Sequence, residues 1–237
     1  MWQSLFEELN KDLNKDLKDP GFIVLAVALD QPEAARPWIE AARATYPCLI
    51  DRDHHVADLY NLVNVPQAVW IDEQGRIVRP PETAGSTDGF RAMDRKTFTM
   101  PEAALAERTR VKAAYLDAVR DWVRHGAASA SALQPAQVAA RLAPPPDAIA
   151  DAHARFRLAQ HLLRRGRPGD AEEARELLAE ATRLHPDSWA MWRQAAVKDA
   201  RGLAAGPEFW ARVDALGSRP YYAPVELAAR PDGEAAA

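Results

Sequence analysis

The sequence contains a single cysteine, Cys48, so any thiol chemistry within it starts from one sulfur atom. A lone thiol can act as a resolving or sensing group when a low pKa keeps it as the thiolate, whereas a buried free cysteine is usually inert. One cysteine also excludes an intramolecular disulfide and a metal site built from cysteines. Cys48 is therefore a candidate secondary thiol, and both interpretations stay open.

Histidines are the other residues whose type could support chemistry. His54 and His55 are adjacent and lie between Asp53 and Asp58. A metal site needs three or four convergent ligands, so this pair by itself predicts a solvated turn. The sequence also lacks a glycine-rich phosphate loop and the Gly-x-Ser-x-Gly and His-Glu-x-x-His motifs. We therefore expect no metal and no cofactor.

The elements that must position these residues follow the order α-β-α-β-α-β-β. Apolar residues recur at helical spacing over residues 1–18, and the continuous apolar run 22–29 is typical of a strand covered on both faces. The remaining predicted elements are a helix with Pro37 in its first turn, a strand at 48–51, a helix at 55–60 and strands at 67–72 and 76–79. Gly75 supplies the positive φ that the turn between the last two strands requires.

A proline enters the first strand of that hairpin, in the segment Val65-Pro66-Gln67. The segments that accompany it are Phe22-Ile23-Val24-Leu25-Ala26-Val27, Tyr46-Pro47-Cys48-Leu49-Ile50-Asp51 and Ile71-Asp72-Glu73-Gln74-Gly75-Arg76-Ile77-Val78. In this order they resemble the TlpA/ResA-like thioredoxin-fold disulfide reductases, over about a third of the chain. The resemblance implies an α/β thioredoxin-like domain, incomplete at its N-terminus, with Val65, Pro66 and Gln67 as the cis-proline loop on the substrate side. The alternative for Pro66 is a trans proline at an edge strand.

The sequence departs from that family at the redox motif. The family places Trp-Cys-x-x-Cys before its first helix, and here that position would fall near Gln3 or before Met1, where the sequence holds no cysteine. The resemblance therefore implies a thiol-disulfide oxidoreductase that reduces a protein or small-molecule disulfide, or alternatively a peroxide. Its active-site motif lies upstream, so the chain as given holds no catalytic residue and is expected to be inactive.

The second half of the chain narrows the resemblance to a bacterial ResA-like subgroup whose motif carries selenocysteine followed by Gly-Cys. The similarity rests on a long predicted loop at residues 80–100, on residues 115–122 and on residues 184–194. Because selenocysteine is encoded by a stop codon, a start assigned downstream of it would begin near Met1. We therefore expect either such a misassigned start or a genuine truncation, and a selenol-dependent reaction in the complete protein.

We predict four segments along the chain. They are a thioredoxin-like domain at 1–126 with a long loop at 80–100 and a closing helix, a linker at 127–150, an all-α helical-hairpin domain at 151–222 and a flexible tail at 223–237. The helical domain resembles tetratricopeptide repeats, which implies either a groove for a peptide partner or a helical cap on the first domain. The alternative function is accordingly a non-catalytic protein-interaction module.

Charge and hydropathy exclude other classes of partner. The formal net charge is −4 and the pI is about 5.9, which favours neither nucleic acid nor an anionic membrane. The longest apolar run, residues 22–29, is too short to span a bilayer, and the first 18 residues lack the apolar core of a signal peptide. As written, the chain is expected in the cytoplasm, while the compartment of the full-length protein stays open.

Overall fold

The computed structural model describes residues 21–142, 144–200 and 202–227, and it divides the chain into two units. Unit 1 combines residues 1–65 with 143–219, and unit 2 combines residues 66–142 with 220–237. The units therefore interleave along the chain, whereas the predicted domains follow one another. The helix predicted over residues 1–18 and the last ten residues of the predicted tail lie outside the described residues.

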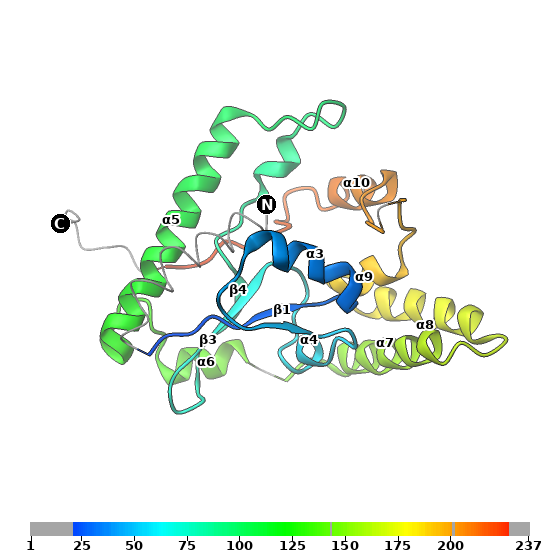
Figure 1. Cartoon of the computed structure of the whole chain (residues 1–237), viewed down its shortest axis with the longest axis horizontal. Helices are drawn as coiled ribbons and strands as arrows, with labels where there is room; N and C mark the ends of the chain where they lie inside the picture. Colours follow the sequence, from blue (N-terminus) through cyan, green and yellow to red (C-terminus); the bar gives the residue numbers. More distant parts are fainter. Residues whose placement is uncertain (1–20, 143, 201, 228–237) are drawn as a thin grey trace. The chain divides into compact units, whose positions relative to one another are not determined.

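Unit 1 contains a short parallel sheet. Strand β1 (Ala26–Ala28), labelled in Figure 1, pairs with β2 (Cys48–Ile50), and Ala26 lies opposite Cys48 in the register. The prediction that the run 22–29 is covered on both faces is wrong, because Ile23 and Leu25 are each 58% exposed. Within the described residues this sheet has two strands, and the hairpin strands of unit 2 form a second two-stranded sheet. Two strands leave one face of the apolar run toward solvent.

Helix α3 (Pro32–Ala42) follows β1 and starts earlier than predicted. Pro32, and not Pro37, occupies the first turn, where a missing backbone N–H costs nothing. Pro37 lies inside the helix. Pro32 and Pro37 both favour the first turn of a helix, and in the structure Pro32 occupies that turn.

Helix α4 (His55–Leu59) is short and depends on a cap from the preceding turn. The carboxylate of Asp51 accepts the backbone N–H groups of His55 and Val56, both at 2.8 Å, and that of Ala57 at 3.1 Å. Asp51 is buried, so these bonds replace the water that the first N–H groups of a helix would otherwise need. The cap fixes the direction of the chain that leads on to Val65.

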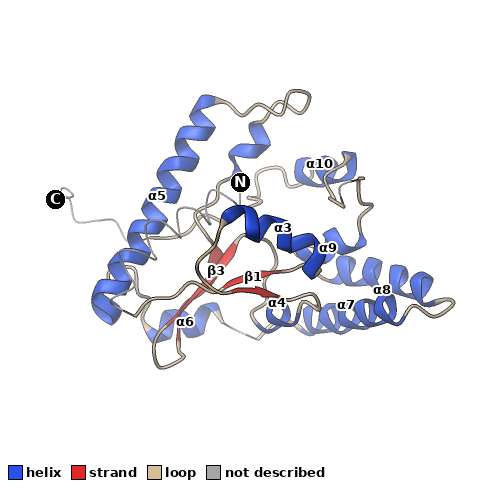
Figure 2. Ribbon diagram, viewed as in Figure 1, coloured by secondary structure: helices blue, strands red, loops and turns tan. Residues whose placement is uncertain are grey.

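The remaining helices of unit 1 are α7 (Asp147–Arg165), α8 (Asp170–Leu184), α9 (Trp189–Ala195) and α10 (Pro207–Asp214). In Figure 2, α7 and α8 run side by side as a helical hairpin. Alanines alternate with larger side chains along the seam between them, which lets the two backbones approach closely. The buried cluster is Ala152, Phe156, Ala159, Leu162, Ala174, Leu178, Ala181 and Met191.

Unit 2 begins with the predicted hairpin. Strands β3 (Gln67–Ile71) and β4 (Ile77–Thr83) are antiparallel. Gly75 has φ of 74°, and the carboxylate of Asp72 accepts the backbone N–H of Arg76 at 2.9 Å. A positive φ at the last residue of a three-residue loop is the usual geometry for this hairpin, so the turn assignment is confirmed.

Strand β4 is longer than predicted and continues through Pro80 and Pro81 to Thr83. The register explains how a strand tolerates two prolines. Ala68 lies opposite Glu82 and Trp70 lies opposite Arg79, so the two prolines share one position of β3. They therefore sit in a bulge, where no ladder hydrogen bond is required of their nitrogen atoms.

Helical segments complete unit 2. They are η2 (Asp88–Ala92), α5 (Glu102–His125), η3 (Gly126–Ala128) and α6 (Pro135–Arg141). The end of the described chain returns to this unit, because the carboxylate of Asp88 accepts the backbone N–H groups of Tyr221 at 2.8 Å and of Tyr222 at 2.7 Å. Among the described helices of both units, none is long and apolar enough to cross a membrane.

Candidate functional site

The predicted substrate-side loop spans the boundary between the two units, with Val65 ending unit 1. In unit 1, the Val65 N–H donates to the side-chain oxygen of Asn64 at 2.9 Å. In unit 2, Pro66 is buried and its carbonyl oxygen accepts the N–H of Ala84 at 3.4 Å, while Gln67 is the first residue of β3. The loop is therefore held by hydrogen bonds on both sides of the Val65–Pro66 bond.

Cys48 lies at the start of β2 and is half-buried. Its Sγ donates to the carbonyl oxygen of Tyr46 at 3.6 Å. Burial raises the pKa of the Cys48 thiol, which reduces the fraction of reactive thiolate at neutral pH. An activated nucleophile needs the opposite shift, so this environment favours an inert thiol.

The segment 53–65, which leads to Pro66, is held by helices α7 and α9 of the same unit. The contacts are Asp53 with Arg164 at 2.9 Å, Asp58 with His153 at 2.7 Å, Asp58 with Arg157 at 3.1 Å, Asn61 with His153 at 3.3 Å, Val63 with Ala190 at 3.0 Å and Asn64 with Arg193 at 3.1 Å. Asp58 lies far from His153 along the chain, so the spacing of residues in the sequence does not reveal this pair. Helices α7 and α9 therefore set the course of the chain into the predicted substrate-side loop.

The adjacent histidines at the start of α4 differ in environment. His55 is exposed, as a solvated turn requires, but His54 is only 6% exposed and its ring packs edge-on against Phe156, with 5.3 Å between centroids. A solvated turn was the wrong prediction for His54. Beside them, Asp53, His55, Arg157, Leu158, His161 and Arg164 line an open cavity of about 420 Å³. Within the described residues no three His, Cys, Asp or Glu side chains converge to hold a metal ion.

Two buried histidines of unit 1, His54 and His185, have pKa values below the usual value. Burial lowers the pKa of His54, opposed by the charges of Asp51, Asp30 and Asp53. Burial also lowers the pKa of His185, which is 4% exposed. Within the described residues, His54 Nδ1 and His185 Nε2 have no hydrogen-bond partner. Protonation would therefore place a proton on a buried ring nitrogen that has no hydrogen-bond acceptor among the described residues.

We expect the free energy of unfolding of unit 1 to fall as the pH drops from 7 to 5. The unfolded histidines titrate near pH 6.5, and the folded ones at lower pH, so the unfolded state takes up protons first. The stabilisation is complete above about pH 6.5 and is lost as the pH falls toward the folded pKa values. Urea denaturation at several pH values, followed by hydrogen exchange of α7 and α8, measures this loss.

The matched variants for this prediction are His54→Gln with His185→Gln, and His161→Gln as the control. The double variant should reduce the dependence between pH 5 and 7 without abolishing it, because burial also lowers the pKa of His153, whereas replacing the exposed His161 should have little effect. The carboxylate of Asp170, with a pKa of about 2 next to Arg165, loses its stabilising effect only at much lower pH. An equally steep dependence in the double variant would contradict the assignment.

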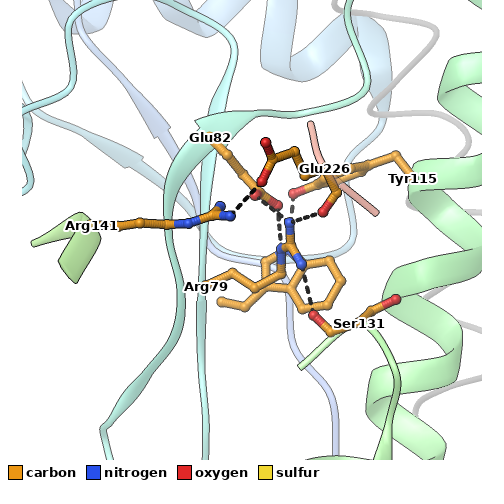
Figure 3. Close-up of polar contacts among 7 residues, drawn as sticks. Arg79, Glu82, Tyr115, Ser131, Arg141 and Glu226 are labelled. Atoms are coloured by element: carbon orange, nitrogen blue, oxygen red, sulfur yellow. Dashed lines mark hydrogen bonds and ion pairs between the residues drawn. The ribbon is translucent and has the colours of Figure 1, made fainter. Parts of the chain in front are cut away.

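Unit 2 contains a buried charged network that the sequence analysis missed. Arg79 is 1% exposed and donates Nε and Nη2 to the two carboxylate oxygens of Glu82, each at 2.8 Å. It also donates to the carbonyl oxygens of Ser131 at 2.8 Å and Glu226 at 3.0 Å. In Figure 3 these groups surround Arg79, while Arg141 from α6 reaches the carboxylate of Glu226 at 2.8 Å.

Aromatic side chains cover the same network. The Arg79 guanidinium lies 5.3 Å from the centre of the Trp70 ring, and Trp70 Nε1 donates to the Tyr115 hydroxyl at 2.9 Å. Burial raises the pKa of Tyr115 far above its usual value, so its hydroxyl stays protonated at neutral pH and does not act as a base. The network therefore joins β4, α5 and the end of the described chain. Its contacts support a structural role.

Comparisons with known proteins place the first part of the chain. Residues 6–79 match the AhpC/TSA family, and the match ends at Arg79. It indicates a thioredoxin-like fold for this part and a thiol-dependent redox function in general, in agreement with the coarser part of what the family resemblance implied. No curated protein and no solved structure shows significant similarity to the chain. The resemblances to TlpA/ResA proteins, to the selenocysteine subgroup and to tetratricopeptide repeats stay predictions.

Proposed function

We propose that this chain is the substrate-side part of a TlpA/ResA-type thiol-disulfide oxidoreductase whose attacking thiol or selenol is not Cys48. Its substrate is a disulfide in a protein or a small molecule, and Val65, Pro66 and Gln67 receive it. The match of residues 6–79 to the AhpC/TSA family carries the proposal. The raised pKa of Cys48 supports the part of the proposal that places the attacking group elsewhere than at Cys48.

The test is reduction of insulin and of hydrogen peroxide with dithiothreitol as electron donor. We expect the chain and its Cys48→Ser variant to react equally and at the rate of the protein-free mixture, because a thiol of raised pKa is a poor source of thiolate. Iodoacetamide should modify Cys48 more slowly than it modifies free cysteine at pH 7. Turnover that disappears in Cys48→Ser would assign the nucleophile to Cys48 and overturn the proposal.

The DNA upstream of the Met1 codon provides the second arm of this test. An in-frame TGA followed closely by a cysteine codon supports a selenol, and two cysteine codons support a dithiol. The product that begins upstream should then reduce the disulfide that the 237-residue chain does not. An upstream product that is also inactive would contradict the proposed reaction.

The helical part of unit 1 supports a role as a cap for the redox domain. Its helices α7 and α9 contact the segment 53–65 through Arg157, Arg164, Ala190 and Arg193. These contacts favour a structural role over recruitment of a peptide partner. A tetratricopeptide-like hairpin that stabilises this loop gives the helical part a function within the same protein.

A further inference from the structure

The loop that ends at Val65 carries a buried amide side chain between two donors. Asn64 is 4% exposed, and its Oδ1 accepts the Val65 N–H at 2.9 Å and Arg193 Nη1 at 3.1 Å. The Val65 N–H and the Arg193 guanidinium can only donate hydrogen bonds. The side-chain oxygen of Asn64, and not its amide nitrogen, must therefore face them. The two lone pairs of this oxygen are thereby occupied, which fixes the Asn64 side chain over its own chain neighbour.

Arg193 reaches this position because α9 is anchored to the same loop. The Ala190 N–H donates to the Val63 carbonyl oxygen at 3.0 Å, one residue before Asn64. At the start of α9, the Ser188 hydroxyl accepts the Met191 N–H at 3.2 Å and holds the first turn. A rigid first turn bound to Val63 places Arg193, one turn further along, beside Asn64.

From this geometry we propose that Asn64 and Arg193 form a gate on the backbone N–H of Val65, and that Arg193 is a positioning residue for substrate binding. The inference rests on the proposed function, in which an extended disulfide-containing peptide pairs with the backbone at Val65. Such a peptide must displace the Asn64 oxygen from Val65, and the bond from Arg193 opposes this displacement because it holds the Asn64 side chain in place. The Asn64 side chain thus occupies the donor that a substrate carbonyl would use.

The gate predicts that removing the Asn64 oxygen strengthens substrate binding. The probe is a six-residue extended peptide with S-methylcysteine at its centre, which resembles a disulfide substrate but does not react. We expect Asn64→Ala to bind it about three to ten times more tightly than the unchanged chain, which is the effect of one competing hydrogen bond. Arg193→Met should act in the same direction and more weakly, and Arg193→Lys should restore the original affinity.

Amide hydrogen exchange of Val65 and Ala190 tests the gate independently of the peptide. Exchange at Val65 should become faster in Asn64→Ala and Arg193→Met, while Ala190 stays protected, which shows that the loop remains folded. Arg219→Met, which removes an exposed contact to Asp187 in the same unit, should change neither readout. This control separates loss of the specific contact from loss of a positive charge.

The outcomes separate failure of the gate from failure of the proposed function. Unchanged exchange at Val65 in Asn64→Ala, or weaker peptide binding by that variant, would overturn the gate. Faster exchange with no peptide binding by any variant, the original chain included, would overturn the substrate side of the proposed function and with it the role of Arg193. Faster exchange together with tighter binding supports both.

Discussion

Replacing Arg79 by methionine should lower the free energy of unfolding of unit 2 by about 3–5 kcal/mol. Methionine keeps an unbranched aliphatic side chain at this position, so the loss reports on the guanidinium, including its contact with the Trp70 ring. Without the guanidinium, the Glu82 carboxylate, whose side chain is 10% exposed, loses its ion-pair partner. The carbonyl oxygen of Ser131 also loses its hydrogen-bond donor. Hydrogen exchange of β3 and β4 under increasing denaturant measures the change.

The control is Arg76→Met in the hairpin turn. Arg76 also pairs with a carboxylate, that of Asp72, but its side chain is 72% exposed, so we expect a loss of about 0–1 kcal/mol. A double variant that joins Arg79→Met with Glu82→Gln should recover part of the stability, since it removes the uncompensated charge. Equal losses at Arg79 and Arg76 would show that burial does not decide the strength of these pairs.

Phe156→Ala should lower the free energy of unfolding of unit 1 by about 3–5 kcal/mol, because it empties the centre of the α7–α8 seam. Phe156 is 3% exposed and also supports the ring of His54, so the variant removes a contact to the loop before α4 as well as the core. The alanines around it cannot fill the space. Exchange of the amides of α7 and α8 under denaturant is the measurement.

Leu158→Ala on the same helix is the control for Phe156→Ala. Leu158 is 45% exposed, so its truncation should cost less than about 1 kcal/mol, since little apolar surface returns to water. Phe156→Leu should fall between the two because it keeps most of the buried volume. A loss at Leu158 as large as the loss at Phe156 would contradict the placement of the seam.

Features that depend on neighbouring residues could be predicted from the sequence. Gly75 marks the hairpin turn, Asp187 and Ser188 are both candidate caps for α9, of which the structure uses Ser188, and Tyr115, Ala118 and Val119 recur at the helical spacing of a buried face in α5. In each case the physical cause lies within a few residues: a positive φ, an orphan N–H or a period of 3.6 residues. These elements formed where their local chemistry indicated.

Features that depend on distant residues could not be predicted. Arg79 looked like the last residue of an exposed strand, yet its partner Ser131 is 52 positions away and Glu226 is 147 positions away. The ion pair between His153 and Asp58 and the hydrogen bond from Arg193 to Asn64 also join residues that are far apart in the sequence. The sequence pattern indicates periodicity and turn chemistry, but tertiary structure determines the partner of a charged side chain. The sequence therefore indicated a candidate loop, which stays a prediction, but it did not indicate the helices that hold this loop.

The return of residues 221–226 to Asp88 and Arg79 has a consequence for synthesis on the ribosome. Unit 2 begins at Pro66, but the backbone groups that complete the shell of Arg79 emerge only after more than 150 further residues, including all of α7 to α10. Domains generally fold as they leave the ribosome, so α7 and α8 can pair while the β3–β4 hairpin still lacks its last segment. Both units can therefore close only late in translation, unit 1 once residue 219 has been added and unit 2 once Glu226 has been added.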